Sequence, residues 1–269
     1  IEKMRTEISD LCCDAAVRGS GVYRLSVPTG GGKTLSSLRY ALATAAQHNK
    51  KHIFFVIPLL SILEQNATVI RNFVGDDDLI LEHHSNLVRE TQIPGEELND
   101  NELLMESWSA PIVITTLVQF LNTLFLGKTS SIRRMNALAN SVIVIDEVQS
   151  VPQKMLSLFN MSMNFLATAC EATIVLCSAT QPCLERLPRP LHYQNPPELI
   201  AAPAGLWDTF RRTEIETVDK HLPYGITSDE LAAFALECMQ QQNSLLIICN
   251  TKTQARTLYT DIVAGTDAA

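Results

Sequence analysis

The sequence has no long apolar run, and it does not open with a charged segment followed by an apolar one. A helix that crosses a membrane needs about 18–20 consecutive apolar residues, so the sequence predicts neither a membrane span nor a membrane partner. The missing leader segment predicts a cytoplasmic location. With 46% hydrophobic side chains in 269 residues, the chain can bury a substantial core. A soluble globular protein is therefore expected.

Cysteines at metal-ligand spacing are also absent. The seven cysteines include no C-x-x-C pair, and several lie inside apolar runs. Zinc ligands and disulfides are disfavoured by this arrangement. Buried, reduced thiols are expected instead, as in a protein of the cytoplasm.

The chain lacks a surplus of basic residues. Its formal net charge of −8 excludes a protein coated in basic surface, because phosphate neutralisation needs clustered Lys and Arg. The charge does not exclude a narrow groove that holds a nucleic-acid strand with a few cations and backbone N–H groups. Arg133-Arg134 and Arg211-Arg212 are basic pairs of this kind. Solvated surface charge is the equally plain alternative for them.

Short apolar runs rich in β-branched residues alternate with stretches of helical periodicity. The expected strands are Val22–Val27, Ile53–Ile57, Ile112–Thr115, Val142–Ile145, Thr173–Cys177 and Leu245–Cys249. The expected helices are Leu35–Gln47, Ser61–Phe73, Leu117–Leu126, Gln153–Ala169, Asp229–Gln241 and one from about Thr253. Such alternation predicts an α/β fold with a parallel sheet and helices on both faces.

The alternation divides the chain into three regions. Residues 1–185 are predicted to form the first domain, and residues 186–225, rich in proline, a connection. Residues 226–269 are predicted to begin a second α/β domain. Because the chain starts at Ile1 and stops soon after this unit begins, we expect a fragment of a longer protein.

A glycine-rich segment follows the first expected strand and precedes a helical pattern. Glycines allow backbone N–H groups to close around phosphates, and the N-terminus of the next helix adds its positive dipole end. In a phosphate-binding loop, Lys33 would contact the β- and γ-phosphates of ATP and the Thr34 hydroxyl would ligate Mg²⁺. The general pattern requires Gly where this chain has Val27. A glycine-rich turn before Lys-Thr is the alternative. The predicted nucleotide-binding residues here are Pro28, Thr29, Gly30, Gly31, Gly32, Lys33 and Thr34.

Two adjacent carboxylates end the apolar strand Val142–Ile145. The carboxyl ends of parallel strands border the ligand crevice of α/β sheets. In combination with Lys33, the pair predicts that Asp146 holds Mg²⁺, partly through water, and that Glu147 orients and deprotonates the attacking water. Lys33, Asp146 and Glu147 are thus the predicted catalytic residues. A solvated surface pair is the alternative.

Ser178-Ala179-Thr180 directly follows the next apolar strand. By itself it is a strand-to-loop turn with capping hydroxyls. In this order after Lys33-Thr34 and Asp146-Glu147, it resembles the S-A-T element of superfamily 2 helicases. That resemblance implies a coupling role for Ser178, Ala179 and Thr180, between the nucleotide state and the nucleic-acid groove.

Together these motifs resemble a DExD/H-box superfamily 2 helicase with Asp146-Glu147-Val148-Gln149 as its box. Further stretches resemble the CRISPR-associated helicase-nuclease of type I systems. They are Pro28–Leu42, Val56-Ile57-Pro58, Ser61–Asn66, Glu82-His83-His84-Ser85 and Asn250-Thr251. The resemblance implies two RecA-like domains and ATP-driven translocation on single-stranded DNA. It also implies recruitment to a type I CRISPR surveillance complex.

The resemblance further implies contacts with the nucleic-acid strand. Short polar side chains and helix N-termini suit phosphate contacts that position a strand without reading its sequence. Helix capping is the alternative for these residues. Gln149 would lie at the nucleotide site and couple it to the strand, or it is an exposed loop amide. The residues implied at the groove are Pro58, Ser61, Gln65, Thr115, Thr116 and Gln119.

Two parts of such a motor are not recognisable. No His-Asp dipeptide is present, so the nuclease chemistry of the family is expected in another domain of the parent protein. The arginines that complete the ATP site from the second RecA-like domain are also absent, so the chain alone is expected to bind ATP and hydrolyse it poorly. Two alternatives remain. One is another superfamily 2 motor on DNA or RNA, and the other is a nucleotide-switched binding module that does not translocate.

Overall fold

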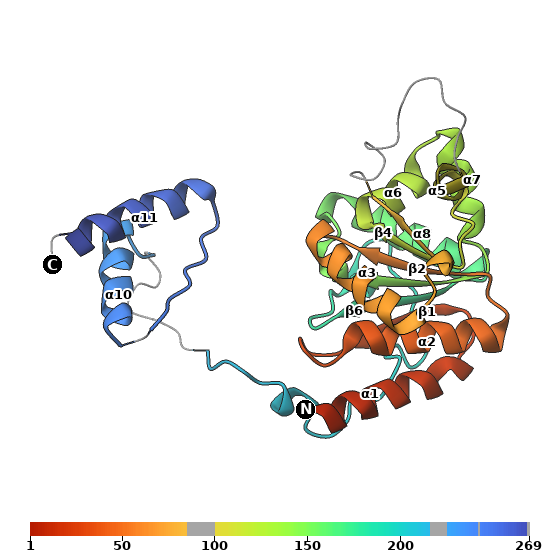
Figure 1. Cartoon of the computed structure of the whole chain (residues 1–269), viewed down its shortest axis with the longest axis horizontal. Helices are drawn as coiled ribbons and strands as arrows, with labels where there is room; N and C mark the ends of the chain where they lie inside the picture. Colours follow the sequence, from red (N-terminus) through yellow and green to blue (C-terminus); the bar gives the residue numbers. More distant parts are fainter. Residues whose placement is uncertain (85–99, 216–224, 242, 268–269) are drawn as a thin grey trace. The chain divides into compact units, whose positions relative to one another are not determined.

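The computed structural model describes residues 1–84, 100–215, 225–241 and 243–267 (Figure 1). Its contacts divide the chain into two compact units, Ile1–Arg211 and Arg212–Ala269. We describe each unit by itself. The first contains every residue that the sequence predicts at the nucleotide site.

The first unit is built on a six-stranded, entirely parallel sheet with strand order β1-β6-β5-β2-β4-β3. Consecutive strands in the chain are joined by helical crossovers, as parallel pairing requires. The strands are β1 (Gly21–Ser26), β2 (His52–Ile57), β3 (Ile80–His83), β4 (Ile112–Thr116), β5 (Ser141–Asp146) and β6 (Thr173–Ser178).

Both faces of the sheet are covered, which explains why its strands are continuous apolar runs. In β5, Val142 and Val144 belong to the core on one face, whereas Ile143 and Ile145 belong to the core on the other. All four side chains are at most 1% exposed. The period of two along a strand thus divides one apolar run between two cores.

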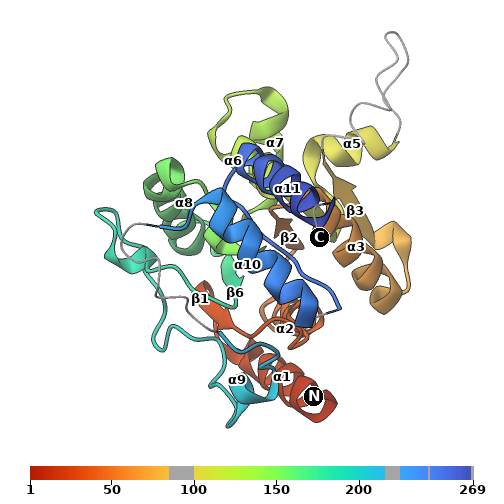
Figure 2. The ribbon, with the colours of Figure 1, turned by 90° about the vertical axis from the view of Figure 1, so that its left-hand side faces the viewer.

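Helices α1 (Glu2–Asp14), α2 (Lys33–His48) and α3 (Leu60–Val74) contribute to the first core. Helix α1 lies beside α2 in both views (Figure 1, Figure 2). The second core is covered by α5 (Asp100–Ser107), α6 (Leu117–Phe125), α7 (Thr129–Ala137) and α8 (Leu156–Thr168). Short 3-10 helices are Ala15–Val17, Asp77–Leu79, Val148–Ser150, Gln153–Met155 and Leu184–Arg186.

Most of the first unit agrees with the sequence prediction. The parallel α/β sheet is confirmed, and five of its strands lie within one residue of the predicted bounds at each end. The predicted helix from Gln153 instead begins as a 3-10 turn and becomes α8 at Leu156. Among the strands and the helices that cover the sheet, four elements were not predicted: α1, α5, α7 and the four-residue strand β3.

The segment 186–211, part of the predicted connection, packs onto the first unit. Leu199, Leu206 and Phe210 are buried in the first core. Leu199 N–H donates to the carbonyl of Arg24 at 2.7 Å, and Arg24 N–H donates to the carbonyl of Pro197 at 2.8 Å. This stretch therefore runs along the outer edge of β1, and it ends with the short helix α9 (Leu206–Thr209).

The described part of the second unit consists of α10 (Ser228–Gln241) and α11 (Lys252–Asp267), which pack on one another. The predicted strand Leu245–Cys249 is not formed. Leu246 and Ile248 are 83% and 86% exposed. The prediction was wrong because a strand requires a neighbour for its backbone hydrogen bonds, and the described residues of this unit contain no strand.

Among the described residues, no helix combines the length and the apolar character needed to cross a membrane. The seven cysteines are all free. Cys12 and Cys177 are buried, as expected, whereas Cys183 is exposed.

Candidate nucleotide-binding site

The candidate site lies at the carboxyl edge of the sheet. The glycine-rich loop leaves the end of β1, Asp146 is the last residue of β5, and Ser178 is the last residue of β6. Parallel pairing brings these ends together, and Asp146 is in register with Cys177, one residue before Ser178. Three motifs that are far apart in the sequence therefore meet at one edge.

The loop between β1 and α2 is a tight turn. Gly31 N–H donates to the carbonyl of Pro28 at 3.0 Å, and Gly30 and Gly32 have φ angles of 84° and 81°. Residues with a Cβ atom rarely adopt this left-handed backbone conformation, whereas glycine adopts it readily. At Gly31 the limit is space, because a Cβ atom would lie 2.5 Å from Cγ1 of Val27.

Val27 is completely buried and belongs to the first core. Its departure from the general glycine pattern is therefore a packing feature. The loop proper starts at Pro28, and Val27 closes its base against Gly31. The valine at position 27, where the general pattern has glycine, therefore leaves the turn itself intact.

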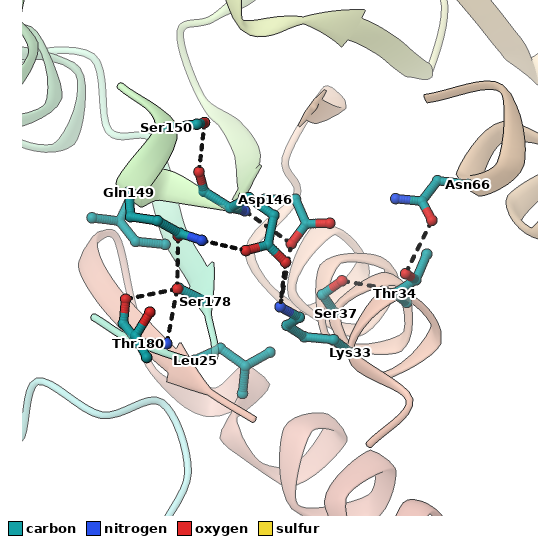
Figure 3. A network of polar contacts seen from close by, with 12 residues as sticks. Leu25, Lys33, Thr34, Ser37, Asn66, Asp146, Gln149, Ser150, Ser178 and Thr180 are labelled. Carbon is teal, nitrogen blue, oxygen red and sulfur yellow. Dashed lines mark hydrogen bonds and ion pairs between the residues drawn. The ribbon is translucent and has the colours of Figure 1, made fainter. Parts of the chain in front are cut away.

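Lys33 is the first residue of α2, and its amine meets both carboxylates at the end of β5 (Figure 3). Lys33 Nζ lies 2.9 Å from Oε1 of Glu147 and 3.8 Å from Oδ1 of Asp146. Burial alone would lower the pKa of the amine. The hydrogen bond to Glu147 and the two negative charges outweigh burial, so the pKa of Lys33 is raised.

The two adjacent carboxylates differ in their surroundings. Burial is the largest effect on Asp146 and raises its pKa, despite the nearby charge of Lys33. Phe55, Val144 and Cys177 form the apolar lining below it. For Glu147, burial is also the largest single effect and opposes ionisation, but hydrogen bonds from Lys33 and Gln149 prevail, and its pKa is lowered.

A chain of hydrogen bonds connects Glu147 to the end of β6 (Figure 3). Gln149 Nε2 donates to Oε2 of Glu147 at 2.6 Å, and Ser178 Oγ donates toward Oε1 of Gln149 at 2.7 Å. Ser178 Oγ also accepts from the Thr180 N–H at 3.0 Å. The structure thus joins the acidic pair, Gln149 and the Ser178-Ala179-Thr180 segment in one network.

The backbone at Glu147 is unusual. Its φ of 47° lies in the left-handed region, where non-glycine residues are uncommon. Its carbonyl accepts from the N–H of Ser150 at 2.9 Å and from Oγ of Ser150 at 2.7 Å. These bonds stabilise a turn that directs the side chain of Glu147 toward Lys33.

Asn66, a residue without a predicted role, lies on α3 and lines the same pocket as Lys33, Thr34 and Asp146. The Thr34 hydroxyl donates to Oδ1 of Asn66 at 3.3 Å. The sequence signal was present but faint. Asn66 is the one polar residue in an inward-facing stripe that also contains Leu63, Ala67 and Ile70.

The residues of the site fit a magnesium nucleotide. Lys33 supplies a cation where the phosphates would lie, and Thr34 and Asp146 supply the oxygen ligands that Mg²⁺ requires. Among the described residues, no group of three or more His, Cys, Asp or Glu could hold a metal by itself. A magnesium ion here would depend on phosphate oxygens and water for its remaining ligands, as is usual for nucleotide sites.

Comparison with known proteins identifies this arrangement. The model of the DEAD/DEAH box helicase family matches residues 6–187, which include the whole candidate site. The chain belongs to this family.

Individual relatives of this chain include the CRISPR-associated nuclease/helicase Cas3 of Haloferax volcanii, 25% identical over 184 residues. That match covers 61% of this chain and 20% of the relative. The crystal structure of T. fusca Cas3 aligns over 96% of this chain and 33% of its own, with a TM-score of 0.66 and 19% identity. Its complex with ATP aligns over 67% and 21%, with a TM-score of 0.54 and 22% identity.

The DUF1998 helicase MrfA aligns over 97% of this chain and 38% of its own, with a TM-score of 0.54 and 14% identity. The structural matches establish the RecA-like fold. The sequence and structure comparisons together support a likeness to the helicase portion of Cas3. This chain spans a fifth to about a third of the Cas3 proteins that it matches.

The residues implied at the nucleic-acid groove lie at the carboxyl ends of β2 and β4 or in the segments that follow them, α3 and α6 included. Ser61 and Gln65 are exposed on the first turns of α3, and Pro58 is half-buried before them. Thr116 caps α6, because its Oγ1 accepts from the N–H of Gln119 at 3.2 Å.

Thr115 differs from these residues. Its side chain is completely buried, and its hydroxyl donates to the carbonyl of His83 at 2.8 Å. The hydroxyl is therefore committed to holding β3 beside β4. Thr115 is therefore less accessible than the other predicted groove residues, and its contact with a nucleic-acid strand stays a prediction.

Proposed function

We propose that this chain is the ATP-binding motor portion of a Cas3-type protein that translocates on single-stranded DNA and unwinds the target of a type I CRISPR complex. The observation that carries the proposal is the contact of Lys33 Nζ with Glu147 and Asp146 at the carboxyl edge of the sheet. A surveillance complex as partner and a nuclease domain elsewhere in the parent protein belong to the same proposal. So does a second RecA-like domain that begins at residue 226.

In the proposed reaction, the N–H groups of the glycine-rich loop and the N-terminus of α2 bind the phosphates of ATP. Lys33 would neutralise the β- and γ-phosphates, and Thr34 and Asp146 would hold Mg²⁺, which when bound would supply positive charge against the phosphate oxygens. Glu147 accepts a proton from the attacking water.

The ion pair of Lys33 and Glu147 provides a way to delay this proton transfer. While Lys33 lies on Glu147, the pKa of that carboxylate is lowered, and a carboxylate of low pKa is a weak base. When Lys33 turns to the phosphates, Glu147 loses this interaction and becomes more basic. Its remaining hydrogen bond to Gln149 connects it to Ser178, through which the state of the strand would reach the base.

The decisive experiment measures ATP hydrolysis by the full-length protein with and without single-stranded DNA, for wild type and Glu147→Gln. We expect strong stimulation by DNA. In Glu147→Gln the rate of DNA-stimulated ATP hydrolysis should fall at least about 100-fold, because the base is lost while nucleotide binding remains. Glu7→Gln, an exposed glutamate of α1, is the matched control and should retain full activity.

The outcomes separate the alternatives. Stimulation by matched RNA instead of DNA would overturn the DNA motor in favour of an RNA motor. ATP binding without hydrolysis stimulated by either polymer would indicate a nucleotide-switched binding module. Undiminished hydrolysis in Glu147→Gln would contradict the assigned base.

A further inference from the structure

Asn66 occupies a position that the proposed reaction leaves unexplained. It lies on α3, one residue beyond the exposed Gln65, and its half-buried side chain is directed inward along the stripe of Leu63 and Ile70. An inward-facing amide is costly unless its polar atoms find partners. The partner that it finds is the Thr34 hydroxyl of the nucleotide site.

The amide contacts one proposed magnesium ligand and lies in the same pocket as the other. Its Oδ1 accepts from the hydroxyl of Thr34 at the N-terminus of α2 at 3.3 Å (Figure 3). Asn66 also lines the pocket that contains Asp146 at the end of β5. One neutral side chain of α3 is thus hydrogen-bonded to Thr34 beside the second proposed ligand.

The direction of the bond at Thr34 has a chemical consequence. A hydroxyl binds a metal through a lone pair on its oxygen, so its proton must point away from the ion. Oδ1 of Asn66 accepts that proton and thereby turns the lone pairs of Thr34 to the other side. Groups behind metal ligands commonly orient them in this way.

We infer that Asn66 is a positioning residue for the magnesium ion, fixing the orientation of the Thr34 hydroxyl from α3. This inference rests on the proposed nucleotide-binding function. It adds a residue that acts on the ion through Thr34. Because α3 also carries Ser61 and Gln65, the same helix reaches the metal end of the nucleotide site and the proposed groove.

The test measures the Mg²⁺ concentration at which binding of a fluorescent ADP to the full chain is half-complete. Asn66→Ala should raise this concentration about tenfold, the lower range for loss of a group behind metal ligands. Its ADP affinity in EDTA should equal that of wild type, because the loop and Lys33 are untouched. Asn72→Ala removes an exposed amide from the same helix and should match wild type throughout.

Asn66→Asp distinguishes positioning from simple packing. It keeps the acceptor for Thr34 and the size of the side chain, and it adds a negative charge near the ion. The half-saturating Mg²⁺ concentration should therefore stay at or below that of wild type. If Asn66→Ala does not fold, as shown by the lack of a cooperative thermal transition, Asn66→Asp tests the inference alone. A requirement for about tenfold more Mg²⁺ in Asn66→Asp would then overturn the inference.

Other results are equally clear. If Asn66→Ala follows the wild-type magnesium curve, the inference fails while nucleotide binding stands. If Ala and Asp raise the magnesium requirement by the same factor, Asn66 acts through packing alone and the positioning role is overturned. Failure of wild type to bind ADP at any Mg²⁺ concentration would overturn the proposed function itself.

Discussion

At the scale of single residues, the acidic pair shows how adjacent carboxylates acquire different properties. Burial against Phe55, Val144 and Cys177 raises the pKa of Asp146, whereas the hydrogen bonds of Lys33 and Gln149 lower the pKa of Glu147. Asp146 is thus held in a site that disfavours its charge. A bound cation would relieve that cost, as expected of a metal ligand.

The consequence for stability follows from the direction of each shift. The folded pKa of Asp146 is above its unfolded value, so its ionisation increasingly destabilises the folded state as pH rises through that interval. The folded pKa of Glu147 is lowered, so its stabilising contribution is present at neutral pH and is lost as pH falls through the folded value. The two effects have opposite signs.

We predict that Asp146→Asn raises the Tm of the nucleotide-free protein at pH 7.5 by about 2 °C or more. The amide removes the buried charge and can still accept the hydrogen bond from the Glu147 N–H. The gain should shrink near pH 4, where the unfolded carboxyl group begins to protonate. Thermal unfolding at both pH values, with the exposed Asp14→Asn as control, measures the effect. A lower Tm at pH 7.5 would show that the charge of Asp146 stabilises the fold through Lys33.

At the scale of elements, the glycine-rich loop depends on the residue that departs from the general pattern. The base of the loop is closed by contact between Gly31 and the buried Val27. A side chain at Gly31 would collide with Cγ1 of Val27 and approach the carbonyl of Pro28 to 3.0 Å. The two positions should therefore behave as a pair.

We expect Gly31→Ala to weaken ADP binding at least about tenfold, because the loop must shift to accommodate the new Cβ atom. Val27→Ala removes Cγ1 and should restore part of the affinity in the double variant. Alone, Val27→Ala should lower the free energy of unfolding by about 1–3 kcal/mol and leave ADP affinity nearly unchanged. Equilibrium ADP titration and urea unfolding measure both quantities. Strictly additive losses in the double variant would mean that Gly31 and Val27 act independently.

The sequence predicted the elements whose pattern is self-contained. The five apolar strands were predicted because a strand that is buried on both faces has a continuous apolar sequence, as in β5. Strand β3 was missed because it has only four residues, and Glu82 and His83 interrupt the pattern. Helix α1 contains six charged residues among thirteen, which obscured the stripe of Ile8 and Cys12. Leu245–Cys249 shows the reverse error, because apolar composition alone does not supply a pairing strand.

For the site, the sequence predicted where the main residues lie but not which way every side chain points. Strand ends located Lys33, Asp146 and Ser178 correctly at one edge, since parallel topology alone brings them together. The roles of Asn66 and Thr115 depend on side-chain direction. Asn66 turns inward to Thr34, and Thr115 turns inward to the carbonyl of His83. The spacing of the residues in the sequence does not predict either side-chain direction.

At the scale of the whole molecule, the boundary of the first unit follows Arg211 and so lies inside the predicted connection 186–225. Arg18 from the start of the chain donates hydrogen bonds to the carbonyls of Pro196, Glu198 and Leu199. Leu199, Ile200, Leu206 and Phe210 complete the first core from this segment. Residues 186–211 therefore pack along β1 and α1 and cover part of the first core, even though they contain no long helix or strand of their own. We call this segment the clasp.

This arrangement predicts different behaviour for two shortened versions of the chain. Residues 1–211 should unfold cooperatively and bind ADP within about twofold of the full chain, because the unit keeps its core and every nucleotide-site residue. Residues 1–185 should lose at least about 5 °C in Tm, since each large apolar side chain that the clasp buries contributes about 1.5–3 kcal/mol before the cost of ordering the segment. Circular dichroism melting and ADP titration of both versions compare them directly. Equal stability of the two would show that the clasp contributes no net stability, and would place the functional boundary of the first domain near residue 185.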